Sequence, residues 1–364
     1  MVTTLKTPIT ELFDIKYPIL LAGMNPKRAL TDTRPRLAAA VTNAGGLGVI
    51  GGLGYGPEQL REQIREIKSN IEDPNLRNKF GVDLLLPQVG GNARKTNYDY
   101  THGQLDELVD IIIDEGTTLF VSAVGVPPRA VVDKLHKHGV VVMNMIGAVK
   151  HVKRALEAGV DVICAQGGEG GGHTGSVPTN ILIPAVVDSV RGHMSPLTHK
   201  PVEVIAAGGI VNGRSLAAAI MWGASAVWIG TRFICAEEAG ASRAHQEAVL
   251  TASYDDTVKT LIYTGRPLRI RKTPYVMDWE TNRRDKIVEL TSAGKLPIEV
   301  EMEEYEKRGN DIPDEVLDNQ HPFLMGEVAA LVHEVKPARA IVDEIVEEAE
   351  AALARGRGVA RARL

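Results

Sequence analysis

The 364-residue sequence has little cysteine, few aromatic residues and no long apolar run. Its two cysteines, Cys164 and Cys235, are too few for a disulfide framework, which favours a reducing compartment. Aromatic residues make up 4% of the chain, so we expect an aliphatic, alanine-rich core. No run approaches the ~20 apolar residues of a membrane span, and the opening residues lack the apolar stretch of a signal peptide. These absences predict a cytoplasmic protein with no membrane partner.

The sequence also lacks a strong excess of charge. It holds 41 Lys and Arg against 46 Asp and Glu, a formal net charge of −5. A nucleic-acid surface needs a basic excess, so we expect no nucleic-acid partner. The histidines His136, His138 and His151 have no partner ligands at zinc spacing, and we expect no metal.

Glycine, by contrast, is abundant, and its 36 copies cluster where short apolar runs end. Eight such runs are predominantly apolar rather than alternating, which is typical of strands buried on both faces. The expected strands are Pro18–Ala22, Gly48–Ile50, Phe80–Leu86, Thr118–Ala123, Val140–Ile146, Val160–Ala165, Val202–Ala206 and Ala226–Ile229.

Amphipathic stretches separate these runs, as crossover helices would. The expected helices are Arg34–Asn43, Pro57–Asn70, Gln104–Glu115, Pro128–His138, Ala148–Ala158, Asn180–Val190 and Gly213–Trp222. Eight β/α units within about 250 residues predict an α/β fold of the (β/α)₈ TIM-barrel class. A doubly wound open sheet uses the same local pattern and is the alternative.

Two segments interrupt this pattern. Pro87–Thr101 is an insertion after the third strand, on the side where barrel loops build active sites. From Tyr254 onward the β/α rhythm stops. We therefore expect a cofactor-binding barrel over residues 1–253 and a C-terminal extension over 254–364 that packs on it.

The extension has three recognisable parts. An extended stretch carries Arg266, Arg269 and Arg271. The acidic run Glu299–Glu306 is typical of a solvated helix face. The segment Val335–Ala354 is strongly helical and can pack on the barrel or on a second subunit, so a homo-oligomer is open.

The loop after the sixth expected strand is the most informative segment. Val162–Gly175 reads VICAQGGEGGGHTG, with His173 among glycines. Glycines at the end of a strand let the backbone approach a ligand closely. A histidine at the catalytic end of a barrel is a candidate acid/base group. The alternative is a flexible loop with an exposed histidine.

Glycines also end the seventh and eighth expected strands. VIAAGG ends at Gly208 and Gly209, and Trp228–Ile229 leads to Gly230 and Thr231. In such barrels the loops after strands seven and eight commonly bind phosphate through backbone N–H groups. These residues are therefore a candidate phosphate site; the alternative is that Gly208–Gly209 only turns the chain.

With these residues in place, the chain resembles the nitronate monooxygenase family, formerly called 2-nitropropane dioxygenases. The resemblance runs from about Tyr17 to Ala352. It is carried by YPILLAGM, AVTNAGGLGVIGG, FGVDLLLP, AQGGEGGGHTG, AAGGI, WIGTRF and HPFLMGEVAALV. Of these motifs, the AQGGEGGGHTG loop is the specific one, whereas the AAGGI and GT pair occurs in many FMN barrels.

The resemblance implies FMN as the cofactor and His173 as the catalytic histidine. It implies that the phosphate lies on Gly208–Gly209 and Gly230–Thr231, beyond Trp228 and Ile229. It further implies that Gly23, Met24 and Gln166 lie along the isoalloxazine and that Gly171 touches the cofactor. His173 would lie beside the nitro group and would remove the α-proton of a neutral nitroalkane.

The chain departs from the family pattern at two positions. Asp83 stands where many relatives have Asn, and an ionised carboxylate accepts hydrogen bonds but cannot donate one. We still expect Asp83 at the cofactor. Thr174 replaces an arginine found in the best-known nitronate enzymes, which removes a positive charge beside the site.

Three functions are compatible with these residues. The leading one is FMN-dependent oxidation of alkyl nitronates by O₂ to a carbonyl compound and nitrite. The second is NAD(P)H-dependent reduction of an activated alkene or quinone on the same flavin barrel. The third is a non-redox barrel that binds a phosphorylated metabolite. Ala362–Arg363–Leu364 resembles a peroxisomal address, so a eukaryotic source would predict peroxisomal import.

Overall fold

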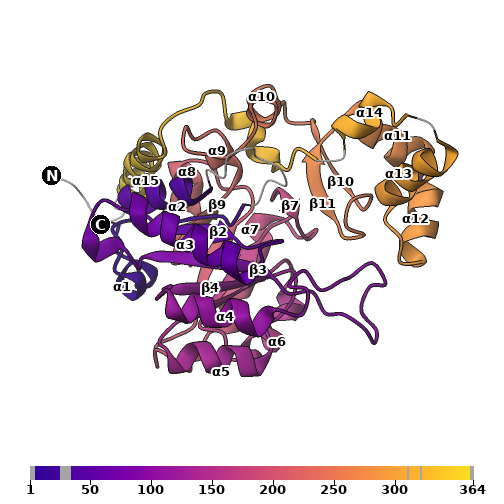
Figure 1. Cartoon of the computed structure of the whole chain (residues 1–364). Helices are drawn as coiled ribbons and strands as arrows, with labels where there is room; N and C mark the ends of the chain where they lie inside the picture. The colour runs from indigo at the N-terminus through magenta and orange to yellow at the C-terminus, as the bar shows by residue number, and fades with distance from the viewer. Residues whose placement is uncertain (1–4, 25–33, 310, 320–321, 361–364) are drawn as a thin grey trace.

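Eight parallel strands close into a barrel in the computed structural model, which describes residues 5–24, 34–309, 311–319 and 322–360 (Figure 1). In sheet order, the strands are β1 (Ile19–Leu21), β9 (Ala226–Ile229), β8 (Glu203–Ala207), β6 (Val162–Gln166), β5 (Val141–Ile146), β4 (Leu119–Ala123), β3 (Phe80–Leu85) and β2 (Gly48–Gly51). A parallel bridge between Leu20 and Leu47 joins β1 to the start of β2 and closes the sheet. The predicted barrel is confirmed, and the open-sheet alternative is wrong.

The two faces of the strands bury different cores, which explains their continuous apolar sequences. Inside the barrel lie Val49, Val121 and Cys164, and α1 (Pro8–Phe13) contributes Phe13 to the same cluster. The outward side chains pack against the surrounding helices in a second and larger cluster. Burial on both faces leaves no polar alternation to read along these strands.

Helices follow the strands and cover the outside of the barrel (Figure 1). They are α2 (Arg34–Asn43), α3 (Pro57–Asn70), α4 (Leu105–Asp114), α5 (Arg129–Lys137), α6 (Val152–Ala158), α7 (Thr179–Val190) and α8 (Gly213–Met221). The expected tail helix is α15 (Ala338–Ala360), which packs against α8 and α2. It therefore lies in the position of the eighth barrel helix. The division of the chain after residue 253 stays a prediction.

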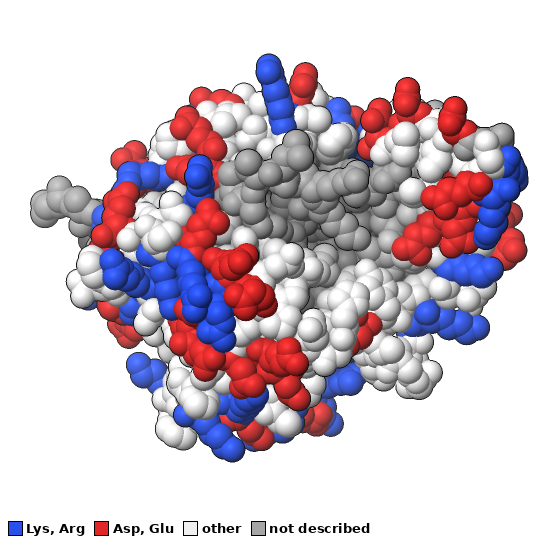
Figure 2. Space-filling view, viewed as in Figure 1, with Lys and Arg blue, Asp and Glu red and all other residues white. Residues whose placement is uncertain are grey.

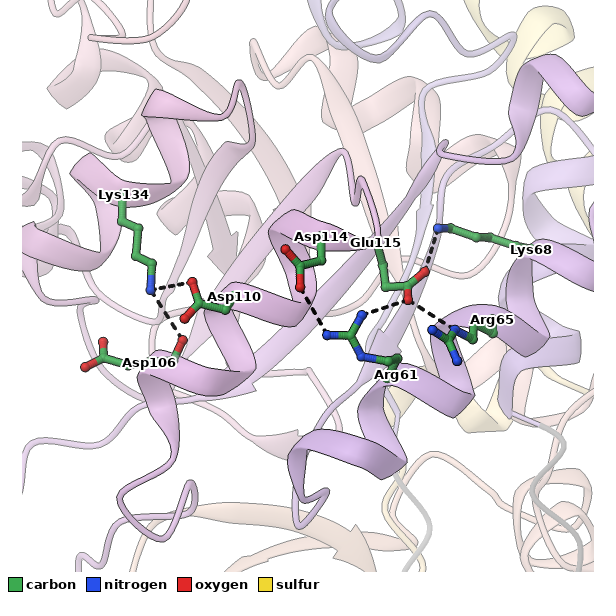
Figure 3. A network of polar contacts seen from close by, with 8 residues as sticks. All are labelled: Arg61, Arg65, Lys68, Asp106, Asp110, Asp114, Glu115 and Lys134. Carbon is green, nitrogen blue, oxygen red and sulfur yellow. Dashed lines mark hydrogen bonds and ion pairs between the residues drawn. The ribbon is translucent and has the colours of Figure 1, made fainter.

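An ion network joins two neighbouring helices of this ring (Figure 3). The Glu115 carboxylate, just after α4, accepts hydrogen bonds from Arg61, Arg65 and Lys68 of α3 at 3.1, 3.2 and 2.8 Å. Burial acts to raise the pKa of Glu115, but hydrogen bonds from Lys68 and Arg61 and the charge of Arg65 lower it. The carboxylate is therefore ionised and paired.

Residues 274–318 of the C-terminal extension form a lobe beside the mouth of the barrel (Figure 1). Its helices are α11 (Pro274–Asn282), α12 (Arg284–Ser292), α13 (Pro297–Arg308) and α14 (Asp314–Asp318), around Trp279. Acidic side chains gather on this lobe in Figure 2. Glu303 and Glu306 of α13 are exposed, as expected of a solvated face, but Glu301 accepts a hydrogen bond from Trp279.

A small antiparallel sheet connects this lobe to the barrel. β10 (Thr257–Thr260) pairs with β11 (Leu268–Arg271), and β11 pairs with β7 (Gly172–His173) from the glycine-rich loop. The remaining elements are α9 (Thr231–Ile234), α10 (Arg243–Leu250) and the 3₁₀ turns Pro74–Leu76, Val149–His151 and Glu327–Leu331. In the described part of the chain, no helix is long and apolar enough to span a membrane.

Candidate active site

A cavity of about 2260 Å³ opens at the carboxyl ends of the barrel strands. Its wall includes the glycine-rich loop after β6, the glycine ends of β8 and β9, the insertion after β3 and part of the extension. Barrel enzymes place their catalytic groups at this end, because eight loops converge there.

Close packing explains the glycines of the loop after β6. A Cβ on Gly167 would lie 1.9 Å from the Thr179 hydroxyl oxygen. A Cβ on Gly171 would lie 2.6 Å from the backbone nitrogen of Gly326, in the extension. Both distances are shorter than any real contact, so these positions require glycine.

Hydrogen bonds hold the same loop in place. The Glu169 carboxylate accepts from the Thr179 backbone N–H and hydroxyl, at 3.0 and 2.7 Å. Arg269 of β11 donates to the Gly168 carbonyl at 2.9 Å, and the Glu327 N–H donates to the Glu169 carbonyl at 3.0 Å. The loop is held by the barrel and by the extension, which argues against the flexible alternative.

His173 lies in β7, where Leu268 of β11 is its partner in the sheet. Its backbone carbonyl accepts a 2.8 Å hydrogen bond from the Gln166 side chain, and its Nε2 lies 3.1 Å from the Thr264 hydroxyl oxygen. Burial, and next the charge of Arg266, lower the pKa of His173 to about 4. The imidazole is therefore neutral at pH 7 and has a nitrogen lone pair that can accept a proton.

Arg266 carries a positive charge in the cavity wall near His173. It donates to the Asn97 side-chain oxygen at 3.0 Å and to the Val124 carbonyl at 3.2 Å. No carboxylate of the described residues forms an ion pair with it. Val124 has a φ of 67°, a strained conformation for a β-branched residue, and it turns the chain at this point. The guanidinium is held in place but its charge is not neutralised.

The glycine ends of β8 and β9 lie side by side, since the two strands pair. Gly208 and Gly209 have φ values of 78° and 71°, so the chain turns sharply there. A Cβ on Gly208 would lie 2.6 Å from the Gly167 carbonyl oxygen. Beyond β9, the Thr231 hydroxyl accepts a 2.9 Å hydrogen bond from the Gly326 N–H.

Asp83 is a buried acid of β3 in the cavity wall, with 4% of its surface exposed. Its Oδ1 atom has no hydrogen-bond partner in the described part of the chain. The carboxyl packs on Gly23, where a Cβ would lie 2.8 Å from Oδ2. Burial raises the pKa of Asp83 to about 8.

The family to which the chain belongs follows from its sequence over nearly the whole length. The model of the family described as nitronate monooxygenase matches residues 6–348. The chain belongs to the nitronate monooxygenase family. Members of this family are oxidoreductases, and the chain is an enzyme of that class.

Individual relatives include a nitronate monooxygenase and proteins with other names. The chain is 30% identical to a probable nitronate monooxygenase of Staphylococcus saprophyticus, over 73% of this chain and 78% of the relative. It is 34% identical to the (3aS,4S,5R,7aS)-5-hydroxy-7a-methyl-1-oxo-octahydro-1H-indene-4-carboxyl-CoA dehydrogenase of Mycobacterium tuberculosis, over 80% of this chain and 74% of the relative. The solved structure of FabK from Thermotoga maritima is 30% identical, with a TM-score of 0.75, covering 98% of this chain and 100% of that one.

The structure brings almost all of the predicted site residues of this family member together. The residues in the cavity wall are Gly23, Met24, Asp83, Gln166, Gly171, His173, Gly208, Gly209, Trp228, Gly230 and Thr231. The Ile229 side chain instead lies in the core between strands and helices. Within the described part of the chain, no three His, Cys, Asp or Glu side chains gather as metal ligands would.

Arg266 is the residue that sequence reasoning missed. Its stretch carries three arginines, but nothing in their spacing indicates that the charge of Arg266 acts on His173. Thr174 uses its hydroxyl to donate to the Gly167 carbonyl at 2.8 Å. The positive charge that acts on His173 comes from Arg266.

The insertion after β3 lines the cavity, as its position in the barrel predicts. Asn97 positions Arg266, and Arg94 donates to the Gly265 carbonyl at 3.3 Å. The Tyr98 and Tyr100 rings lie 4.2 Å apart, with Tyr100 buried. Arg94 itself is exposed, consistent with a loop whose basic side chains face solvent.

Proposed function

We propose that this enzyme binds FMN in the barrel mouth and oxidises small nitronates with O₂ to a carbonyl compound and nitrite. The observation that carries the proposal is the pairing of a neutral His173 with an unneutralised Arg266 in one cavity wall. A nitronate is the anion that forms when a nitroalkane loses the proton on its α-carbon. A cation can bind this anion, and a proton acceptor near it can remove the α-proton of the neutral nitroalkane.

The cavity wall fits FMN in three respects. The turn at Gly208–Gly209 and the glycine end of β9 offer backbone that a phosphate can approach. Gly23 has no side chain to displace Asp83, so the Asp83 carboxyl can lie in the cavity wall against the Gly23 backbone. Asp83 also has an oxygen, Oδ1, without a partner among the described residues, as a site for a heterocycle would.

Bound FMN would supply the electron-transfer chemistry, and the chain would supply position and proton handling. Arg266 would bind the nitro oxygens, because its contacts to Asn97 and Val124 fix the guanidinium while its charge is free for a ligand. His173 would accept the α-proton of a neutral nitroalkane, and Thr264 would orient the imidazole through Nε2. The loop held by Glu169 and Arg269 would keep both groups fixed and limit entry of water.

The volume of the cavity favours a second candidate. At about 2260 Å³ it is larger than the ~300–1,000 Å³ of most ligand sites, and FMN with a small nitronate would leave much of it open. A relative at 34% identity is a dehydrogenase of a carboxyl-CoA compound. NAD(P)H-dependent reduction of an activated alkene or a quinone would use the same flavin and the same His173.

One aerobic and one anaerobic measurement distinguish nitronate oxidation from NAD(P)H-dependent reduction. Nitronate oxidation predicts that a primary nitronate is consumed with O₂ and that nitrite appears, while NADH and NADPH leave the flavin spectrum unchanged without O₂. Rapid anaerobic bleaching by either nicotinamide, with no nitrite formed, would support the reductase instead. A protein that takes up no FMN would contradict both.

A further inference from the structure

Asp83 has surroundings that are unusual for a buried acid. It lies between Gly51 of β2 and Val121 of β4 in the sheet, neither of which carries a polar side chain. Its Oδ1 atom has no partner among the described residues, and burial is the cause of its raised pKa. A carboxylate left in such a place costs several kcal/mol unless a cation or donors compensate it.

The nearby titratable groups do not compensate this acid. The Cys164 thiol on β6 is fully buried; burial, and next the charge of Asp83, hold the pKa of that thiol far above its usual range. His173 is neutral above about pH 4 and does not change charge near neutrality. Asp83, with a pKa of about 8, is therefore an acid in this wall that changes its charge at mildly alkaline pH.

We propose that Asp83 keeps its proton at neutral pH and donates a hydrogen bond from its carboxyl O–H to the heterocyclic ring of the bound flavin. This inference rests on the proposed binding of FMN. The oxidised flavin ring presents several carbonyl and ring-nitrogen acceptors but one ring N–H donor. A neutral acid has a donor as well as an acceptor, so it matches these acceptors of the flavin ring better than a carboxylate does.

An acid that keeps its proton can take the place of the asparagine that the resemblance leads us to expect at position 83. An amide donates through its NH₂ group, and a protonated carboxyl donates through its O–H, so Asp83 can take over that donor role. The two differ in one respect: the acid loses its donor and gains a negative charge when pH rises above its pKa. Flavin binding should therefore weaken at alkaline pH in this chain.

The test is the FMN dissociation constant, measured by fluorescence quenching from neutral pH to about pH 9.5. In the wild type we expect binding to weaken ~10-fold across this range, the equivalent of one lost hydrogen bond of ~1.4 kcal/mol. Asp83→Asn should bind within ~3-fold of the wild type at neutral pH and lose this pH dependence. Asp83→Leu, which has no donor, should bind ~10-fold more weakly at neutral pH and also without pH dependence.

Infrared spectroscopy provides a readout that does not depend on affinity. At neutral pH the wild type should show the carbonyl band of a buried carboxylic acid, and Asp83→Asn should lack it. Glu115→Gln, the matched change of a buried carboxyl to an amide outside the cavity, should retain the band.

Specific results would overturn the proposal. They are an FMN affinity of the wild type that is constant to pH 9.5, the absence of the acid band, or a loss of more than ~10-fold in Asp83→Asn at neutral pH. If Asp83→Asn fails to fold, the wild-type titration and its infrared band still decide the question. A wild type that binds no FMN at any pH would contradict the proposed function rather than the state of Asp83.

Discussion

Two buried carboxyls in this molecule have opposite surroundings. Glu115 on the outer ring accepts hydrogen bonds from three cations of α3, and its pKa is lowered. Asp83 at the barrel mouth has an oxygen without a partner in the described part of the chain, and its pKa is raised to about 8. The same chemical group is thus a paired, ionised element of structure in one place and an unpaired acid in the other.

The difference extends from these two residues to the regions that hold them. On the outer ring, Asp110, Asp114 and Glu115 are paired with cations (Figure 3), whereas the barrel mouth holds Asp83, a neutral His173 and an unneutralised Arg266. A buried carboxyl oxygen without a partner and a cation without a counter-ion cost stability, which favours a ligand that completes them. The following changes test that division, in order of decreasing effect.

Replacement of His173 by Asn should have the largest effect. Loss of a positioned acid/base group lowers kcat/KM for a neutral nitroalkane by ~10²–10⁴. In the wild type, the acid limb of the kcat/KM profile should lie near pH 4, below the usual range of histidine, because the free enzyme's imidazole has that pKa. The matched control is His138→Asn, a change at an exposed position. Equal turnover in both variants would exclude His173 as the base.

Replacement of Asp83 by Asn should stabilise the protein in the absence of added flavin. The pKa of Asp83 is raised on folding, so the folded state holds a proton that the unfolded state has released between pH ~4 and ~8. Unfolding free energy should therefore fall by up to ~1.4 kcal/mol per pH unit over that window in the wild type. Asp83→Asn should flatten this slope and gain roughly 2–4 kcal/mol at pH ~7, measured by urea unfolding. A wild type whose stability rises across the window would refute this sign.

Replacement of Arg266 by Met should weaken the binding of anionic substrates. A hydrogen bond to a charged group contributes ~1.5–3 kcal/mol, so the KM for a nitronate should rise ~10–100-fold with a smaller change in kcat. Lys95→Met removes a cation from an exposed position of the insertion and is the control. An unchanged KM in Arg266→Met would show that the anionic substrate does not bind at Arg266.

Replacement of Glu115 by Gln should have the smallest of these effects, with the opposite dependence on pH. The pKa of Glu115 is lowered on folding, so its contribution is present above the unfolded pKa of ~4.3 and is lost as pH falls below it. Arg65 is 63% exposed, so we expect a loss of only ~1–2 kcal/mol at neutral pH and no change in kcat/KM. A loss of activity would show that the outer ring and the barrel mouth are not separate.

Sequence reasoning reached the parts of this molecule that depend on local pattern. Each β/α unit is short, so apolar runs ending in glycine predict both the strands and the loops that meet at the mouth. The position of Arg266 depends instead on the pairing of His173 with Leu268, two residues far apart in the chain. The protonation of Asp83 depends on burial by neighbouring strands, and the docking of α15 depends on α8 and α2, which no local pattern shows.

The most direct test of the account is the visible spectrum of the purified protein, before and after FMN is added and the excess removed. We predict a stoichiometric flavin spectrum that a nitronate reduces anaerobically and that O₂ restores. A protein that stays colourless after reconstitution would contradict the central claim, that the residues of the barrel mouth form a flavin site.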